Sequence, residues 1–525
     1  MSVMSTMYTG IAGMLTSSTG MSVVSNNLAN TSTVGYKGSK ITFEDTFYQA
    51  INSAQGVSQV GTGVTVSAIY GDFSQGAYET TTSATDLAIN GNGYFQLVNP
   101  VSGSVYYTRA GDFTFDKSGY LTDAHGYNVQ GWAVDGEGSP VGAATDIRID
   151  SSQSPPSATT AVSMLLNLDS TAEDSCVDAA NPFFAMFSAW DGTGDTPLGD
   201  ALYAYQNSIT VYDENGASHV LTVYFDKVGE DTYTDGAAGS SVWEYVVTCD
   251  PSEDGRTIDG TALATTSAAG LLMAGTLTFS SAGEMKGMTA YTLSSGASGN
   301  MSNLANWTPA EFSDNGFPVF TANFTGAQDA SATGEPQARP IELNLGLGTR
   351  NVTGSGWNAA TAASAAAVGS SFANVGNLLE PDLETSSTTS YDSATTTRTQ
   401  AQDGYTSGYL LELSVDTNGV VTGRYSNGQI EDLWVVALCD FANEDGLQRQ
   451  GGNLFSQTRD SGEAVMGTPG TASLGSISSN TLEQSNVDMA TQMVQMITLQ
   501  RVYDGSSKII STANEMLQTV IGLKR

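Results

Sequence analysis

The chain has 525 residues, with 18 Lys and Arg against 54 Asp and Glu, so its formal net charge is −36. Such a charge repels phosphates and anionic headgroups, which excludes a nucleic-acid binder with a basic surface and argues against attraction to an acidic membrane face. Charged residues make up only 14% of the chain and hydrophobic ones 40%. We therefore expect a folded acidic protein of three or four domains, at about 150 residues per domain.

Cysteine and histidine are scarce. Cys176, Cys249 and Cys439 lie far apart and show no Cys-x-x-Cys spacing, unlike a disulfide framework. His125 and His219 are the only histidines, which leaves little material for zinc binding or histidine-based catalysis. The acidic turns at 135–138 and 213–216 do not continue into a calcium-binding loop ending in Glu. We expect no metal site, no cofactor and no catalytic site.

The sequence also bears on location. No stretch reaches the roughly 18 apolar residues that a membrane-spanning helix needs, so we expect no membrane insertion. The first basic residue is Lys37 and no apolar segment follows Met1, so the N-terminus does not resemble a secretory signal. The expected location is the cytoplasm, or outside the cell by an export route that does not use such a signal.

The first predicted element is a helix within residues 1–33, in a stretch that carries no charge before Lys37. Its apolar residues recur in steps of three and four, as in one side of a coiled coil. They are Met4, Met7, Ile11, Met14, Met21 and Leu28. Gly10, Gly13 and Gly20 each cost the helix roughly 1 kcal/mol relative to Ala. The helix is therefore expected to need a partner.

Residues 34–70 are expected to connect this helix to an inner β domain formed by 71–148 and 404–483. Short apolar runs alternate there with Gly-centred turns, such as the turn at 90–93 before a strand at 94–98. The late half repeats the pattern: strands at 409–415 and 420–425 flank Asp416-Thr417-Asn418-Gly419, and 433–439 is expected to be a buried strand.

Residues 149–403 are expected to form an outer β region, as one domain or as two with an inserted subdomain. Its clearest strands are expected at 208–212, 219–225 and 242–248. Residues 351–407 are rich in Ala, Ser, Thr and Gly. That composition predicts mainly connectors and loops.

The last predicted element is a helix from Asn486 to Arg525. One apolar stripe recurs near a 3.5-residue period, at Met489, Met493, Met496, Tyr503, Ile510, Leu517 and Ile521. A second stripe contains Val494, Ile497, Val502, Ile509 and Val520. Pairing with the N-terminal helix would cover only one of these stripes. The apolar stripe left uncovered favours packing against other subunits. The alternative is that both ends are core helices of one globular domain.

These elements predict a multidomain α+β fold with paired N- and C-terminal coiled-coil helices and nested, mainly-β domains. The first motif that can be assigned follows the first helix: Asn26, Asn27, Leu28, Ala29, Asn30, Thr31, then Gly35, Tyr36 and Lys37. It closely resembles the N-terminal signature of the bacterial flagellar axial proteins of rod, hook and hook–filament junction. Three further motifs follow in the expected order, at 84–95, 107–113 and 482–488.

Within that group the chain is most similar to flagellar hook proteins. The stretches 43–48, 426–429 and 446–455 fit the hook type, and about 250 residues separate the halves of the first β domain, which is too many for a distal rod protein. The alternatives are another axial protein, of the distal rod or hook–filament junction, or a surface enzyme or adhesin unrelated to flagella.

The resemblance implies a structural subunit rather than an enzyme. Such subunits leave the cell through the flagellar type III export apparatus and polymerise into a helical tube, with paired terminal helices innermost and β domains outside. The tube acts as a universal joint that transmits torque. Its implied partners are further copies of the chain, the distal rod, the hook cap and the hook–filament junction proteins. The expected subunit-interface residues are the apolar stripe of the N-terminal helix and the first apolar stripe of the C-terminal helix.

Overall fold

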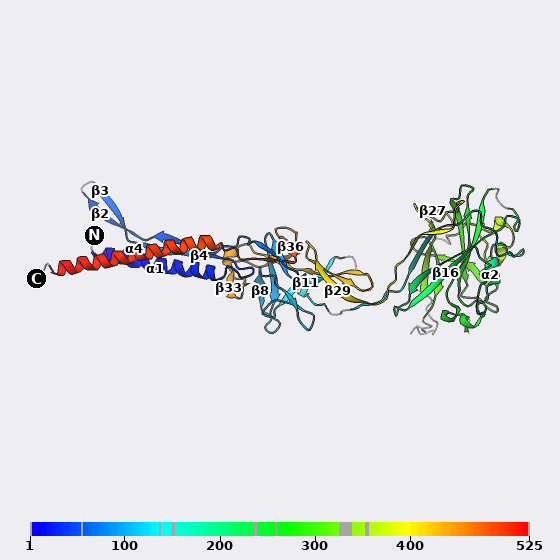
Figure 1. Ribbon diagram of the computed structural model, residues 1–525, viewed down its shortest axis with the longest axis horizontal. Coiled ribbons are helices and arrows are strands. Elements are labelled where there is room, and N and C mark those ends of the chain that lie inside the picture. The colour runs from blue at the N-terminus through cyan, green and yellow to red at the C-terminus, as the bar shows by residue number, and fades with distance from the viewer. Residues whose placement is uncertain are drawn as a thin grey trace. The chain divides into compact units, whose positions relative to one another are not determined.

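The computed structural model describes residues 3–53, 56–135, 138–149, 153–235, 239–258, 260–324, 339–351 and 356–522. The chain forms two compact units (Figure 1). The terminal unit contains Met1–Gln153 and Tyr409–Arg525, and the insert unit contains Ser154–Gly408. Both are rich in β-strands, and a long helix lies near each end of the chain. The prediction of a multidomain, mostly-β fold whose terminal helices pack together is confirmed.

Helix α1 (Val3–Ala29) and helix α4 (Met489–Gly522) lie side by side in the terminal unit (Figure 1). They run antiparallel, since Gly10 faces Ile510 while Asn27 donates a hydrogen bond to Gln492. A capping residue fixes the start of α4: the Asp488 carboxylate accepts the Thr491 backbone N–H at 2.9 Å. No helix in the described part of the chain has the length and apolar content to cross a membrane.

The segment after α1 contains more regular structure than the sequence predicted. Strand β1 (Ser39–Asp45) pairs with β4 (Val64–Gly71), and β2 (Tyr48–Ser53) pairs with β3 (Gly56–Gly61), both antiparallel. The Thr16 hydroxyl lies 3.3 Å from the Val64 carbonyl oxygen, so the first hairpin covers a face of α1. The expected connector at 34–70 is therefore largely β structure.

One antiparallel sheet holds most of the remaining terminal unit. Its central order is β29-β30-β31-β11-β7-β8-β34-β33. These strands are β29 (Gly408–Val415), β30 (Val420–Tyr425), β31 (Ile430–Val436), β11 (Asn128–Val134), β7 (Tyr94–Val98), β8 (Val105–Thr108), β34 (Leu454–Ser456) and β33 (Gln448–Gly451). Five short strands branch from it: β9 (Thr114–Phe115), β10 (Leu121–Thr122), β12 (Pro140–Asp146), β32 (Leu438–Asp440) and β35 (Val465–Gly467).

Two small ladders also join the early and late parts of the terminal unit. Strand β5 (Tyr78–Thr80) pairs with β37 (Thr481–Glu483), and β6 (Leu87–Asn90) pairs with β36 (Ser476–Ser479). Early and late strands thus form one β structure around a core that includes Phe95, Val129 and Val436. The expected strands at 94–98 and 420–425 are confirmed. The expected strand at 433–439 is wrong as a single element, because β31 ends at Val436 and β32 pairs separately with β7.

The insert unit contains two larger sheets. The first has the order β15-β16-β17-β20-β21-β22 and is antiparallel. It comprises β15 (Tyr205–Tyr212), β16 (Ser218–Lys227), β17 (Ser241–Thr248), β20 (Leu271–Phe279), β21 (Met285–Leu293) and β22 (Trp307–Pro309). The second has the order β23-β24-β25-β14-β28, with β14 and β25 parallel. It comprises β23 (Glu311–Phe312), β24 (Pro318–Ala322), β25 (Arg339–Asn344), β14 (Ala161–Asn167) and β28 (Thr396–Gln402).

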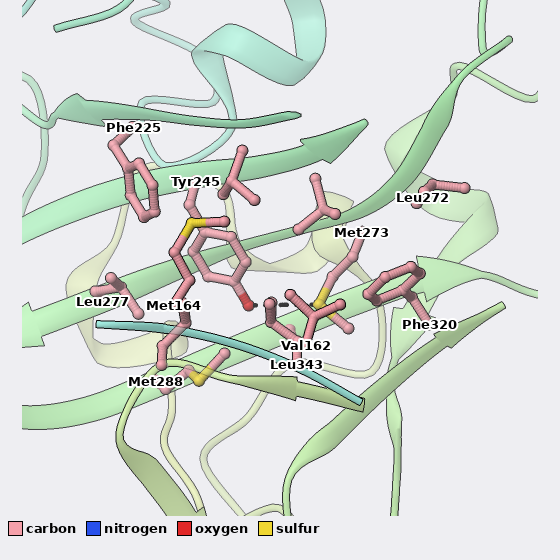
Figure 2. Packing of buried hydrophobic residues seen from close by; sticks show 14 of the residues in the cluster. Val162, Met164, Phe225, Tyr245, Leu272, Met273, Leu277, Met288, Phe320 and Leu343 are labelled. Atoms are coloured by element: carbon pink, nitrogen blue, oxygen red, sulfur yellow. Dashed lines mark hydrogen bonds between the residues drawn. The ribbon is translucent and has the colours of Figure 1, made fainter. Parts of the chain in front are cut away.

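The first sheet is covered on both faces, which explains why every residue of β20 is buried. Between the two sheets lies an apolar cluster that includes Met164, Phe225 and Phe320. Figure 2 shows these side chains together with Tyr245, whose hydroxyl lies 3.6 Å from the Met273 sulfur. A second cluster covers the opposite face, under short helices. The short elements of this unit are α2 (Ala185–Ala189), α3 (Ala365–Val368), β18 (Thr257–Ile258), β19 (Thr261–Ala262), β26 (Leu347–Thr349) and β27 (Pro381–Leu383). Strand β13 (Gln153–Ser154), at the boundary of the two units, instead pairs with β29 of the large sheet.

The expectation of connectors and loops at 351–407 is wrong where the chain forms α3, β27 and above all β28. Strand β28 pairs with β14 from Gln402↔Val162 to Thr396↔Asn167. Thr is β-branched and favours strands, and most of β28 is exposed, so this strand has no apolar pattern to reveal it. Val368 also belongs to a buried cluster.

Candidate functional site

Small residues form the contact between α1 and α4. A Cβ atom added to Gly10 would lie 2.9 Å from Ile510 Cγ1, one added to Gly13 would lie 2.6 Å from Ser506 Oγ, and one added to Gly20 would lie 3.1 Å from both Leu499 methyl carbons. Glycine lets the two backbones approach closely, because it carries no side chain between them. The helices are therefore packed along the glycine face of α1, which we call the glycine seam.

The glycine seam covers the residues predicted as the subunit interface only in part. On α1, Met4 and Ile11 of the predicted stripe are exposed. The other members, Met7, Met14, Met21 and Leu28, are half-buried. On α4, the predicted stripe is split as well. Met496, Tyr503, Ile510 and Leu517 are half-buried on the side of α1, and Met489, Met493 and Ile521 are exposed.

Both helices also carry large apolar side chains that are exposed to solvent, and we call this set the outer stripe. Its members expose between 41% and 70% of their surface. They are Met4, Tyr8, Ile11 and Leu15 on α1, and Met489, Met493, Val494, Ile497, Val502, Ile509, Met516, Val520 and Ile521 on α4. Exposed apolar side chains gathered on two adjoining helices are typical of a protein–protein contact.

The signature residues form the end of α1 and the turn that leaves it: Asn26, Asn27, Leu28 and Ala29 lie within the helix, whereas the sequence predicted that the motif follows it. The Asn27 amide donates to the Ser39 carbonyl at 2.8 Å and its oxygen accepts the Ser39 N–H at 2.9 Å, so one side chain joins the helix to β1. Asn26 donates to the Tyr36 hydroxyl at 3.0 Å. Nearer the turn, Asn30 donates to the Asn26 carbonyl at 2.8 Å. These polar residues therefore fix the direction in which the chain leaves the helix.

The remaining signature residues contribute unequally to this turn. The Thr31 hydroxyl donates to the Leu28 carbonyl at 3.1 Å, closing the helix end. Gly35 has a positive φ of 65° and lies against the Ala110 backbone, which only glycine permits without strain. Leu28 is half-buried and Ala29 is exposed. Tyr36 lies under the Arg449 guanidinium, 5.7 Å from its ring centre.

A buried ion cluster joins the early and late motifs. The Lys37 ammonium lies 2.7 Å from Glu483 Oε1, and Arg109 Nη1 lies 3.5 Å from Glu483 Oε2, with all three side chains at most 3% exposed. Burial lowers the pKa of Lys37, and Glu483 opposes this effect. A buried charge is stable only when it is paired, so Glu483 is required by both cations.

Backbone hydrogen bonds complete this cluster, which we call the Glu483 junction. The Gly35 N–H donates to the Glu483 carbonyl at 2.7 Å, and the Gly76 N–H donates to its carboxylate at 2.9 Å. Arg109 Nη2 donates to the Gly91 carbonyl at 2.8 Å and its guanidinium lies over the Tyr94 ring at 5.2 Å. All four sequence motifs thus contribute to the Glu483 junction, with the motif at 84–95 joined to it through Arg109.

The described residues contain no group of three His, Cys, Asp or Glu side chains arranged to hold a metal ion. His125 Nδ1 lies 2.9 Å from Asp123 Oδ2 in a turn, and His219 Nδ1 lies 2.9 Å from Glu253 Oε2. The His219 ring is also stacked on Phe324. Asp213 accepts the Asn215 and Ala217 N–H groups, as expected for a hairpin turn, whereas the turn at 135–138 lies partly outside the described residues.

Two features were missed in the sequence. Glu483 and Arg109 were noted only as members of sequence motifs, because nothing in the neighbouring sequence shows that they contact Lys37. The glycine seam, by contrast, could have been found from the spacing of small residues in the sequence. Gly10, Gly13, Ser17 and Gly20 repeat at steps of three, four and three, which is the spacing of one helix face.

Four family models match successive parts of the chain. They are "Flagella basal body rod protein" at 7–37, "Flagellar hook protein FlgE/F/G D1 domain" at 88–164, "Flagellar basal body protein FlaE D2 domain" at 167–405 and "Flagellar basal body rod FlgEFG protein C-terminal" at 478–523. The first contains most of α1, the last contains all of α4, and the third falls within the insert unit.

Several relatives match along their whole length. The chain is 30% identical over 539 residues to the flagellar hook protein FlgE of Borreliella burgdorferi, covering 99% of this chain and 100% of the relative. It is 29% identical to FlgE of Treponema pallidum, covering 100% of both, and 29% identical to FlgE of Escherichia coli, covering 98% of each. A crystal structure of Helicobacter pylori FlgE2 matches 77% of this chain and 100% of that chain, at 13% identity and a TM-score of 0.41. By its likeness, along nearly the whole chain, to the hook proteins of Borreliella burgdorferi, Treponema pallidum and Escherichia coli, the chain belongs to the flagellar hook protein family.

Proposed function

We propose that the chain is a structural subunit of the bacterial flagellar hook, and that copies of it assemble into a helical tube. The tube serves as a flexible universal joint that transmits torque from motor to filament. The observation that carries the proposal is the outer stripe: α1 and α4 pair with each other and still leave apolar faces uncovered. Repeated contacts between unlike surfaces generate an open helical assembly.

The paired helices are proposed to form a coiled coil that lines the tube. The burial of α4 supports this, because its less exposed residues recur at steps of four and three: Gln492, Met496, Leu499, Tyr503, Ser506, Ile510, Ala513 and Leu517. The proposed contacts between subunits are the outer stripe together with the stripe residues predicted from the sequence. The predicted residues are Met4, Met7, Ile11, Met14, Met21, Leu28, Met489, Met493, Met496, Tyr503, Ile510, Leu517 and Ile521. Methionine packs adaptably, which suits contacts that shift as a tube bends.

The domain division predicted from the sequence is also proposed. It consists of a helical domain of 1–33 with 484–525, a connecting segment of 34–70, an inner β domain of 71–148 with 404–483, and outer β structure in 149–403. The insert unit supports the last part, since the backbone groups of Ser157 and Tyr405 hydrogen-bond to each other at its two ends, both at 2.9 Å.

The outer part is proposed to form the surface of the tube. Residues 154–408 contain 6 Lys and Arg against 29 Asp and Glu, so this part carries −23 of the total charge of −36. A strongly negative surface keeps subunits soluble by mutual repulsion. The further partners proposed are the distal rod, the hook cap, the hook–filament junction proteins and the type III export apparatus, with the assembled chain outside the cell.

The test changes Val494, Val502 and Ile509 together to Ser in the full-length chain. These side chains are exposed, so the variant should keep its helix content by circular dichroism and lose the ability to form polymers that sediment and appear as tubes by electron microscopy. A matched control changes two exposed valines of the insert unit, Val177 and Val220, to Ser and should still polymerise. Normal tubes from the first variant would exclude the outer stripe as the assembly surface.

Location is tested separately. Antibody to residues 154–408, applied with immunogold to intact flagellated cells, should label the short curved segment between cell surface and filament. Label elsewhere on the axis would assign the chain to the rod or the junction instead, and label spread over the cell wall would contradict a flagellar role.

A further inference from the structure

Two carboxylates face each other in the interior of the insert unit. Asp226 of β16 and Glu244 of β17 are directly opposite in the antiparallel register, which places both side chains on the same face of the sheet. They are 0% and 2% exposed. Like charges directly opposite on a sheet are destabilising, and burial adds the cost of removing each charge from water.

Neither carboxylate has a basic partner among the described residues. Asp226 Oδ2 accepts the backbone N–H groups of Ser175 at 3.0 Å and Cys176 at 2.8 Å, and Glu244 accepts that of Met186 at 3.0 Å. Asp226 Oδ1 has no partner at all in the described structure. Residues 174–186, which we call the strap, are therefore bound to the two carboxylates of the sheet, and the hydrogen bonds come only from backbone N–H groups.

The other groups that face this pair are acidic or neutral. Asp174 of the strap accepts the Gly229 N–H at 2.9 Å and adds negative charge, as does Asp178 near Cys176. Lys227 follows Asp226 on β16, but its ammonium donates to the Ser170 carbonyl at 2.7 Å. On β20, the residue opposite Glu244 is Thr276, whose hydroxyl pairs with Thr289 at 2.7 Å.

We propose that Asp226 and Glu244 hold at least one proton between them in the folded chain at neutral pH, and that this proton keeps the strap docked on the sheet. Burial supports this, since it raises the pKa of Asp226 to about 6 and raises that of Glu244 well above its usual value. A raised pKa contributes stability that is complete below the unfolded pKa and lost as pH rises through the folded one. The insert unit is thus a proton-sensitive element that loosens as pH rises, first through Asp226 near pH 6.

Asp226→Asn tests the proposal in the full-length chain, because Asn can accept the same backbone hydrogen bonds without a charge. Urea unfolding is followed by tryptophan fluorescence, since four of the six tryptophans lie in the insert unit. Below about pH 4 the variant should match the wild type, and at about pH 8 its ratio of folded to unfolded chain should be up to about a hundredfold higher. Glu244→Gln should behave likewise. Asp392→Asn, which removes an exposed charge of the same unit, should leave the pH dependence unchanged.

Two measurements keep the proposal falsifiable if a variant folds poorly. Infrared spectroscopy of the wild type at neutral pH should show the carbonyl stretch of a protonated carboxyl group, lost above the transition. Hydrogen exchange, compared between variants at one pH, should show the strap better protected in Asp226→Asn at high pH. The proposal is overturned if the carboxyl band is absent, if Asp226→Asn is no more stable than the wild type at high pH, or if Ca²⁺ rather than protons restores protection of the strap.

Discussion

The glycine seam predicts that the same substitution has opposite effects at two helical positions. At Gly10, an added Cβ would lie 2.9 Å from Ile510 Cγ1 and 3.3 Å from the Ser506 carbonyl oxygen. At Gly505, nothing lies within 4 Å of an added Cβ. Both glycines lie within helices, so replacement by Ala improves helix propensity at either site by about 1 kcal/mol.

The two positions differ in packing. Inserting a methyl group into the tight contact at Gly10 costs about 1–3 kcal/mol, since backbone on one side and a branched side chain on the other must move. Gly10→Ala should therefore lower the free energy of unfolding by between zero and about 2 kcal/mol, while Gly505→Ala should raise it by about 1 kcal/mol. The difference between the variants measures how closely the two helices are packed.

Denaturant unfolding of the full-length chain, followed by far-ultraviolet circular dichroism, measures both values. A double variant provides the internal control, because Ile510→Ala removes the atoms that the new methyl group meets. Gly10→Ala should be less damaging in the presence of Ile510→Ala than alone, as a positive coupling in a double-mutant cycle. If Gly10→Ala stabilises the chain as much as Gly505→Ala does, the close packing described here is wrong.

Three further results are expected. Glu483→Gln should destabilise the terminal unit by about 3–5 kcal/mol in urea unfolding, because two buried cations lose their partner, whereas the exposed Glu463→Gln should change stability by less than about 0.5 kcal/mol. Burial raises the pKa of all three cysteines to about 12, so a thiol reagent at about pH 8 should label none of them until the chain is denatured; one labelled cysteine in the native chain would contradict their burial. Phe187→Ala should cost about 3–5 kcal/mol in unfolding, and Phe47→Ala, 91% exposed, should cost almost nothing.

Local chemistry made part of the fold predictable. The turn at 416–419 is an example, because Asp416 Oδ1 accepts the N–H groups of Asn418 and Val420, and Gly419 has a φ of 76°. Those interactions involve neighbours in the sequence, so residue type alone indicates them. The Asp488 carboxylate caps the first turn of α4 by a similarly local interaction, but the helix begins at Met489 and not at Asn486 as expected.

Other features depend on residues far apart and leave no local trace. Lys37 and Glu483 are separated by 446 positions, and neither residue's neighbourhood shows that they pair. The face by which α1 meets α4 was not predicted, for a different reason. Apolar periodicity shows which residues avoid water, but several surfaces can satisfy it, and the closeness allowed by Gly10 and Gly13 decided between them.

The pairing of α1 with α4 has a consequence for how the chain is made. Contacts such as Gly10 with Ser506 cannot form until almost the entire chain has been synthesised, which at about 5–20 residues per second takes roughly 25–100 s. The insert unit is complete earlier, once Gly408 has been added. During this interval the first helix has no partner within its own chain, and its apolar residues are free to bind copies at the same stage. A cell that makes this protein must therefore protect the nascent N-terminus for longer than any other part of the chain.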